Sequence, residues 1–423
     1  MRKCVFLALL FAASLQAQDI SGDWQGTRKL DAGDDRIIIK IAKADDRPWK
    51  ATIFFVDAVS FDAGFPWESA ILQGSILKLT IHLFSDQTYE GKVSADGTSI
   101  DGTWTIDKKS WPVEFKRATP DTAWKDLSPH TVRFVSVDKD VNLQVLDWGG
   151  TGRPLVLLTG LGNDAHVYDK LAPKLTDRYH VYAITRRGFG VSSAPAPTSE
   201  NYSADRLGDD VLAVIDSLKL SRPVLAGHSI AGEELSSVGS RHPEKVAGLI
   251  YLDAAYPYAY YDHSRGDVFI DSNEVRRKLD QLEFRYPPDT RMLHELLETN
   301  LPALERSMRR ELTDSEADSS QPQSHLSPLY QAIFAGEQGY TDIRAPILAI
   351  FAFPHNLQSI ADPKARAAAN ADDLENHGAQ IKAFGTGLPS ARVVRFANAD
   401  HYIFRSNEAD VLREMNAFIA GLP

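Results

Sequence analysis

The sequence predicts an α/β protein in which a mostly parallel sheet, with helices on both faces, follows a separate antiparallel β domain. Two patterns support this fold class. Residues 19–117 contain short alternating apolar runs separated by turn residues, whereas residues 131–423 alternate apolar strand-like runs with helical segments. The composition agrees with a globular chain, because 43% of the 423 residues are hydrophobic and 24% are charged. This length exceeds that of a single small module.

The first 17 residues have the pattern of a secretory signal peptide. Arg2 and Lys3 precede a short apolar run over residues 5–13, and small residues lead to a cleavage position after Ala17. The apolar run is about half the ~20 residues that a membrane span needs, so we expect cleavage rather than a stable membrane anchor. The expected location is therefore secreted or periplasmic. Cys4 is the single cysteine, and cleavage would remove it.

The charge balance of the sequence limits the kinds of binding partner that we expect. Asp plus Glu number 57 against 46 Lys plus Arg, which gives a net charge of −11 and disfavours nucleic acid. The sequence contains neither a zinc-binding His-Glu-x-x-His motif nor a glycine-rich phosphate loop, and His355 and His377 have no partners at metal-ligand spacing along the chain. We therefore expect no cofactor and no metal. Nothing in the sequence indicates the oligomeric state.

The β domain, residues 19–117, has the strand spacing of a small barrel or sandwich. Trp24, Trp67 and Trp104 could line a lipocalin-like cavity, but we favour the interpretation that they fill the interior, as side chains usually do in small barrels. A proline-containing segment, residues 118–130, is predicted to be a linker. The predicted strands cover residues 36–42, 49–55, 76–83, 88–93, 99–106 and 112–115.

The second domain, residues 131–423, is predicted to contain an open sheet with crossover helices. An insertion at about 255–342 breaks the alternation and has helical spacing. Predicted strands cover residues 131–137, 142–148, 154–159, 181–185, 223–226, 247–253, 347–353 and 391–396, and helices are expected near 165–175, 204–218, 230–240, 365–383 and 407–419.

The most informative segment runs from Val224 to Gly232. An apolar strand leads into Gly227, Ser229 follows two residues later, and a helical pattern begins at once. Small residues on both sides allow a sharp strand-to-helix turn that exposes the serine hydroxyl at the carboxyl end of the sheet. The fifth place of the Gly-x-Ser-x-Gly pattern is Ala231, which is still small. A serine that only caps a helix is the competing interpretation.

The serine turn and three further segments together make residues 131–423 resemble the α/β-hydrolase superfamily. Leu157–Gly162 stands where this family has its oxyanion loop, with Thr159 in place of the usual histidine. Arg187–Ser192 resembles the loop after the fourth strand, and His401 follows the last predicted strand, where the family carries its base. The resemblance implies a serine hydrolase with a helical lid.

The roles that the resemblance implies are those of acyl transfer. Ser229 would be the nucleophile and His401 the general base, and the backbone N–H groups of Leu161 and Ile230 would form the oxyanion hole. Neither N–H depends on side-chain identity, so Thr159 does not preclude the site.

The acid of the triad is the open assignment. The usual position after the seventh strand has no carboxylate in Phe353–Asn356. Asp253, which ends the sixth strand, occupies a second position that some members of the family use, and we prefer it to Asp362, the nearest later carboxylate. Glu233 and Glu234 are a third option, but acids in the first turn of a helix are favoured by its dipole.

These observations predict an exported carboxylester hydrolase that acts on a small-molecule substrate through an acyl-enzyme. Amidase or peptidase activity would use the same residues. Two more functions are compatible with the sequence: a non-catalytic binding protein on the same scaffold, and a cofactor-free carbon–carbon hydrolase or perhydrolase. Epoxide hydrolases and dehalogenases of this superfamily have an aspartate where Ser229 stands, which disfavours those activities.

Overall fold

The computed structural model describes residues 18–30, 33–43, 49–55, 65–67, 69–82, 86–106, 109–122, 128–283, 286–287, 289–317, 326–358, 360 and 362–423. The predicted signal peptide, with Cys4, lies outside these residues, as do residues 123–127 of the predicted linker. The chain forms two compact units, the first built mainly from residues 18–122 and the second from residues 128–423.

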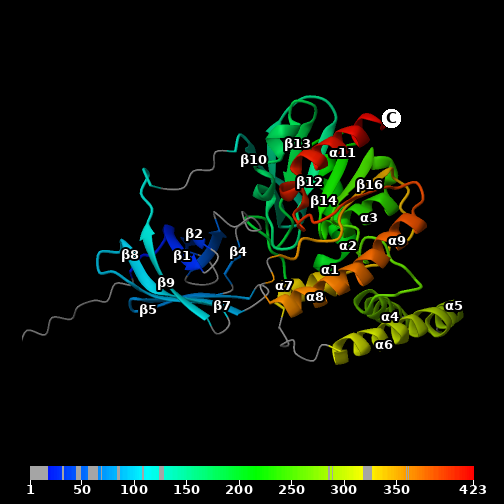
Figure 1. Cartoon of the computed structure of the whole chain (residues 1–423), viewed down its shortest axis with the longest axis horizontal. Coiled ribbons are helices and arrows are strands. Elements are labelled where there is room, and N and C mark those ends of the chain that lie inside the picture. Colours follow the sequence, from blue (N-terminus) through cyan, green and yellow to red (C-terminus); the bar gives the residue numbers. More distant parts are fainter. Residues whose placement is uncertain are drawn as a thin grey trace, which may run out of the picture. The chain divides into compact units, whose positions relative to one another are not determined.

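The first unit is one antiparallel sheet (Figure 1). Its strand order is β4-β3-β2-β1-β9-β8-β7-β6-β5, so most sequence neighbours are also sheet neighbours, while the first and last long strands, β1 and β9, pair with each other. The strands are β1 Gly22–Leu30, β2 Gly33–Ala42, β3 Lys50–Phe55, β4 Phe65–Pro66, β5 Ser69–Gln73, β6 Ile76–His82, β7 Asp86–Val93, β8 Ser99–Ile106 and β9 Lys109–Arg117.

Aromatic side chains form much of the buried core of the first unit. Trp24 and Trp104 are fully buried and Trp67 nearly so, and the rings of Trp67 and Trp104 pack edge to face with centroids 5.2 Å apart. The buried Tyr89 hydroxyl donates to the carbonyl oxygens of Ile100 and Val113, at 3.0 and 3.1 Å. The burial of the three tryptophans agrees with the core-filling interpretation.

The second unit contains an eight-stranded sheet in the order β10-β11-β13-β12-β14-β15-β16-β17. The six strands from β13 to β17 in this order are parallel, and β11 runs antiparallel to both of its neighbours. The predicted α/β fold class is therefore confirmed. The strands are β10 Thr131–Asp138, β11 Val141–Gly149, β12 Pro154–Leu158, β13 His180–Ile184, β14 Val224–His228, β15 Gly248–Leu252, β16 Ile347–Ala352 and β17 Arg392–Phe396.

Helices cover both faces of this sheet (Figure 1). The helices α2 (Ala204–Ser217), α3 (Ala231–Arg241) and α9 (Gly378–Gly387) pack on one face, and α11 (Glu408–Ala420) packs on the other. Shorter elements are α1 Ser199–Tyr202, η3 Pro243–Lys245 and α10 Ile403–Ser406.

One predicted helix is wrong. Residues 165–175 form two 3₁₀ turns, η1 (Ala165–Tyr168) and η2 (Ala172–Leu175), which pack beside α11 on the same face of the sheet. Pro173 lies in the second turn and has no backbone N–H to donate, so a continuous α-helix is interrupted there.

A helical segment connects β15 to β16. It contains α4 Val268–Glu283, α5 Thr290–Glu295, the π-helical turn η4 Leu296–Asn300, α6 Leu301–Ala317 and α7 Pro328–Phe334. The predicted helix at 365–383 is divided into α8 Pro363–Asp372, the π-helical turn η5 Asp373–His377 and α9. Among the described helices, none has the length and continuous apolar character that crossing a bilayer requires.

Candidate active site

Ser229 lies at the sharp turn between β14 and α3. Its φ is +54°, in the left-handed region that a residue with a side chain adopts at a cost, as expected for a serine held at such a turn. The turn depends on two glycines. A Cβ on Gly227 would lie 2.9 Å from the Ala231 Cβ, and a Cβ on Gly232 would lie 1.9 Å from the carbonyl oxygen of Ala254. Gly227 thus leaves room for Ala231, which explains how alanine fits the fifth position.

Asp253 and His401 come together at the same edge of the sheet. Asp253 follows β15 directly and is fully buried, and its Oδ2 lies 2.7 Å from the Nδ1 of His401. The other oxygen, Oδ1, accepts the backbone N–H of Ala352 at 3.0 Å. These bonds fix the carboxylate and leave the Nε2 of His401 as the nitrogen available to a substrate or nucleophile. Within the described residues, no direct hydrogen bond joins Ser229 to His401.

The carboxylate of Asp253 is strongly stabilised as an anion. Burial by itself raises its pKa, but hydrogen bonds from His355 and His401, together with their charges, outweigh burial and hold the pKa well below its usual range. The preferred acid is therefore ionised and bonded to the predicted base.

The remaining acidic candidates lie elsewhere. The exposed Asp362 caps α8, because its Oδ2 accepts the backbone N–H of Ala365 at 2.7 Å. Glu234 forms a buried two-point ion pair with Arg186, with both N–O distances 2.8 Å. Glu233 is fully buried, and burial raises its pKa well above the usual range. None of these three hydrogen-bonds to His401 in the described part of the chain.

The predicted oxyanion loop approaches the serine closely. A Cβ added to Gly160 would lie 3.2 Å from the Ser229 Cβ and 2.8 Å from the Nδ1 of His228, so only glycine allows this approach. In the described structure, neither the Leu161 nor the Ile230 backbone N–H donates to a protein acceptor. These two donors directly follow Gly160 and Ser229, the residues between which the close approach occurs.

His228 is buried beside the predicted base. Its Nε2 lies 3.0 Å from the carbonyl oxygen of His401, and the centroids of the two rings are 4.7 Å apart. Burial lowers the pKa of His228 well below its usual range, so the ring is neutral. His228 therefore packs against His401 as an uncharged ring.

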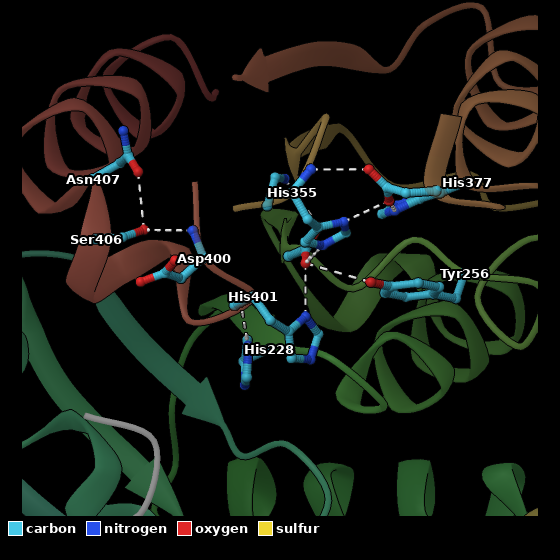
Figure 2. Close-up of polar contacts among 11 residues, drawn as sticks. His228, Tyr256, His355, His377, Asp400, His401, Ser406 and Asn407 are labelled. Atoms are coloured by element: carbon cyan, nitrogen blue, oxygen red, sulfur yellow. Dashed lines mark hydrogen bonds and ion pairs between the residues drawn. The ribbon is translucent and has the colours of Figure 1, made fainter. Parts of the chain in front are cut away.

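A second histidine, His355, which the sequence analysis considered only as a metal ligand and set aside, lies at the site. His355 follows β16, where the superfamily usually has its acid, and its Nε2 lies 2.9 Å from the same Oδ2 atom of Asp253 that His401 contacts (Figure 2). Asp373 and His377, at the two ends of the turn η5, continue this network. We call Asp253, His355, Asp373, His377 and His401 the histidine–aspartate network.

Two sets of three residues in this network have ligand atoms close enough together to hold a metal ion: Asp253, His355 and His401, and His355, Asp373 and His377. A third set, His130, His166 and Asp169, lies apart from the network. Both ring nitrogens of His355 are already within hydrogen-bond distance of carboxylate oxygens. Hydrogen bonds thus engage both ring nitrogens of His355, whereas the buried Nε2 of His377 has no hydrogen-bond partner in the described structure.

Residues 153–407 match the sequence profile of the α/β-hydrolase fold family. The chain belongs to this family. The match spans both Ser229 and His401. It also covers the strands β12, β14, β15 and β16, which hold the site together.

Individual proteins match a smaller part of the chain than the family profile does. The chain is 33% identical to a fluoroacetate dehalogenase from a Burkholderia species over 133 residues, which are 31% of this chain and 43% of that protein. It is 30% identical to epoxide hydrolase 4 of Mus musculus over 149 residues, 35% of this chain and 41% of that one. The chain thus matches less than half the length of these curated relatives.

Among solved structures, a hydrolase from Pseudomonas aeruginosa PA01 superposes with a TM-score of 0.43 and 20% identity. The superposition covers 68% of this chain and 98% of that one.

Proposed function

We propose that the chain is a serine hydrolase of small-molecule carboxylic esters, with Ser229, His401 and Asp253 as its catalytic triad. The observation that carries the proposal is the 2.7 Å contact between His401 Nδ1 and the buried Asp253 Oδ2, at the strand edge where Ser229 is held at positive φ. A buried carboxylate on Nδ1 fixes the tautomer in which Nε2 can take a proton. A binding protein would have no need of this arrangement.

The first half of the reaction forms an acyl-enzyme. The Ser229 oxygen attacks the ester carbonyl carbon while its proton passes to Nε2 of His401, and the carbonyl electron pair moves onto oxygen. The N–H groups of Leu161 and Ile230 stabilise that oxyanion, and losing one such donor typically costs ~100- to 1,000-fold in rate. The intermediate then expels the alkoxide, which takes the proton from His401.

The second half returns the enzyme to its starting state. Water attacks the acyl carbon and gives a proton to His401, and the Ser229 oxygen leaves and recovers that proton. Asp253 stabilises the imidazolium in both halves. The same steps would cleave an activated amide, so a comparison of matched ester and amide substrates decides between these two classes.

The dehalogenase and epoxide hydrolase names of the relatives do not transfer to this site. Serine attack on an alkyl carbon would produce an ether, which water does not cleave under these conditions. A serine nucleophile therefore favours a substrate with a carbonyl carbon, because its acyl ester can be hydrolysed in the second step.

A fluorophosphonate probe and a panel of activated esters test the proposal. We expect the wild type to be labelled on Ser229 and to turn over short esters, and Ser229→Ala to lose both properties. Equal labelling of Ser229→Ala would show that another residue is the nucleophile. An unlabelled and inactive wild type would favour a binding protein.

We also propose that residues 1–17 direct export. The mass of the chain recovered from the exported fraction should correspond to a start at Gln18. A full-length mass would contradict this.

A further inference from the structure

His355 is enclosed by two carboxylates. Its Nε2 lies 2.9 Å from Asp253 Oδ2, and its Nδ1 lies 2.7 Å from Asp373 Oδ1. The backbone N–H of His355 also donates to Asp373 Oδ2, at 2.9 Å. A ring nitrogen without hydrogen would place its lone pair against a carboxylate oxygen. Both ring nitrogens must therefore be donors, and a ring with two N–H donors is an imidazolium.

The surroundings support this charge. Only 13% of the His355 side chain is exposed, and Asp373 is 9% exposed. Burial alone lowers the pKa of His355, but hydrogen bonds to Asp253 and Asp373 and their charges outweigh burial and raise the pKa to about 9. Without this cation, two buried carboxylates would face each other across the position of the ring, which is costly.

We propose that His355 is a positioning residue for the triad acid, whose fixed positive charge keeps Asp253 oriented and limits how strongly Asp253 draws a proton onto His401. The proposal rests on the proposed serine-hydrolase function. It assigns His355 no contact with substrate, since its two ring nitrogens are both engaged by carboxylates.

The mechanism follows from the shared oxygen. Both imidazole rings lie within hydrogen-bond distance of Asp253 Oδ2. The negative charge of Asp253, which would stabilise a protonated His401, is therefore partly offset by the positive charge of His355. The cation thus reduces the stabilisation that Asp253 gives to a protonated His401, compared with an unopposed carboxylate. Asp373 stabilises the protonated form of His355 through the Nδ1 contact. It lies on the side of His355 opposite the Asp253 contact.

Four other titratable side chains that lie in or against this network are uncharged. Burial lowers the pKa of His377, whose Nδ1 lies 3.3 Å from Asp373 Oδ1, and that of His228 beside His401. Burial raises the pKa of Tyr256, which donates to Asp253 Oδ2 at 3.4 Å, and that of Tyr258. All four are therefore neutral near pH 7.

A cavity of about 540 Å³ borders His355, and His401 is not among its lining residues. His377 and Tyr256 also line it. This cavity gives a small molecule a route to the position that a truncated His355 would vacate. The charged side chains in its lining are Asp262, Arg265, Asp267, Arg310, Glu311, Asp372 and Asp373.

The test is the pH dependence of kcat/KM for an activated ester in the full chain. In His355→Gln the amide still donates to Asp253 but carries no charge, so the midpoint of the acidic limb should rise by about one pH unit, the size of effect that a nearby charge commonly has. His377→Gln is the matched control. His377 is buried in the same network but neutral. The acidic limb of the His377→Gln profile should therefore keep the wild-type midpoint.

Chemical rescue separates charge from packing. In His355→Ala, added imidazole should return the limb toward its wild-type midpoint, because protonated imidazole donates to both carboxylates. Protonated 1-methylimidazole has only one N–H and should rescue less. If His355→Gln is unstable, the double variant His355→Gln/Asp373→Asn removes the cation with its outer anion, and the limb should still rise.

The outcomes distinguish the two proposals. A wild type that neither labels with the fluorophosphonate nor hydrolyses esters overturns the proposed function and the role of His355 with it. An active wild type whose acidic limb is unchanged in His355→Gln overturns only the role of His355. Nitrogen-15 NMR of labelled histidine gives an independent check, since a neutral His355 at pH 7 would also overturn it.

Discussion

Ser229 and Asp253 occupy equivalent backbone positions on neighbouring parallel strands. Each is the first residue after its strand, β14 or β15, and both have positive φ, +54° and +48°. The two ends are linked directly, because the Ser229 N–H donates to the carbonyl oxygen of Leu252 at 3.4 Å. The side chains of Ser229 and Asp253, both assigned to act with His401, are thus oriented in the same way, by a residue with positive φ directly after a strand.

The first prediction concerns the strain at Ser229. A non-glycine residue in the left-handed region costs about 1–2 kcal/mol, so Ser229→Gly should be about 1 kcal/mol more stable than Ser229→Ala. Urea unfolding of the two inactive variants measures the difference. Equal midpoints would show that the turn stores no such strain.

The second prediction separates the two candidate acids. Asp253→Asn should reduce kcat/KM by about 10³- to 10⁴-fold, because the amide cannot stabilise the imidazolium and supports the wrong tautomer. Asparagine tolerates positive φ, so the fold should be retained. Asp362→Asn should keep wild-type activity, since Asp362 only caps α8. Steady-state kinetics with circular dichroism checks both, and full activity of Asp253→Asn would remove Asp253 from the triad.

The third prediction tests the close approach at the serine turn. In Gly232→Ala the new Cβ would lie 1.9 Å from the Ala254 carbonyl oxygen, which must move. We expect a loss of about 2 kcal/mol or more in unfolding free energy, with reduced kcat, because Ala254 follows Asp253. Gly385→Ala in α9 is the control. Its Cβ would meet only Val393 at 3.6 Å, so it should be neutral or stabilise by about 0.5–1 kcal/mol.

The fourth prediction uses the buried Glu233. Both of its carboxyl oxygens are buried, and in the described structure neither has a hydrogen-bond partner. Burial raises its pKa well above the usual range, while Arg186 opposes this effect. A raised native pKa means that stability is lost as pH rises above the unfolded value of about 4.5.

Glu233→Gln removes this titration. The difference in unfolding free energy between the variant and the wild type should therefore favour the variant more at pH 8 than at pH 5. Urea titrations at the two pH values give that difference. A constant difference would show that Glu233 does not titrate abnormally.

The strands of the second unit could be predicted from sequence to within about two residues, because parallel strands buried on both faces are continuous apolar runs. The same runs placed Ser229 and Asp253 at strand ends and His401 in the segment after the last strand. The geometry then paired Asp253, and not Asp362, with His401, a choice that depends on the neighbouring registers of β15 and β16.

The network around His355 could not be predicted in the same way. Spacing along the chain gives His355 no metal-binding partners, whereas its partners in the fold, Asp253 and Asp373, are 102 and 18 residues away. One signal was available, since a histidine stands at the usual position of the acid. Its meaning depends on tertiary contacts from η5, and no local periodicity specifies a π-helical turn.

That turn also changes the phase of the helix that contains it. A π turn holds more residues than an α turn, so the side chains before Asp373 are out of phase around the helix axis with those after His377. None of the residues of α8 is buried, whereas α9 buries Gln380, Ile381 and Phe384. Deleting one residue between Asp373 and His377 would restore a uniform helix, but it would rotate either the packed face of α9 or the carboxylate of Asp373 out of place. The core of this unit and its buried charge are therefore tied to the same extra residue.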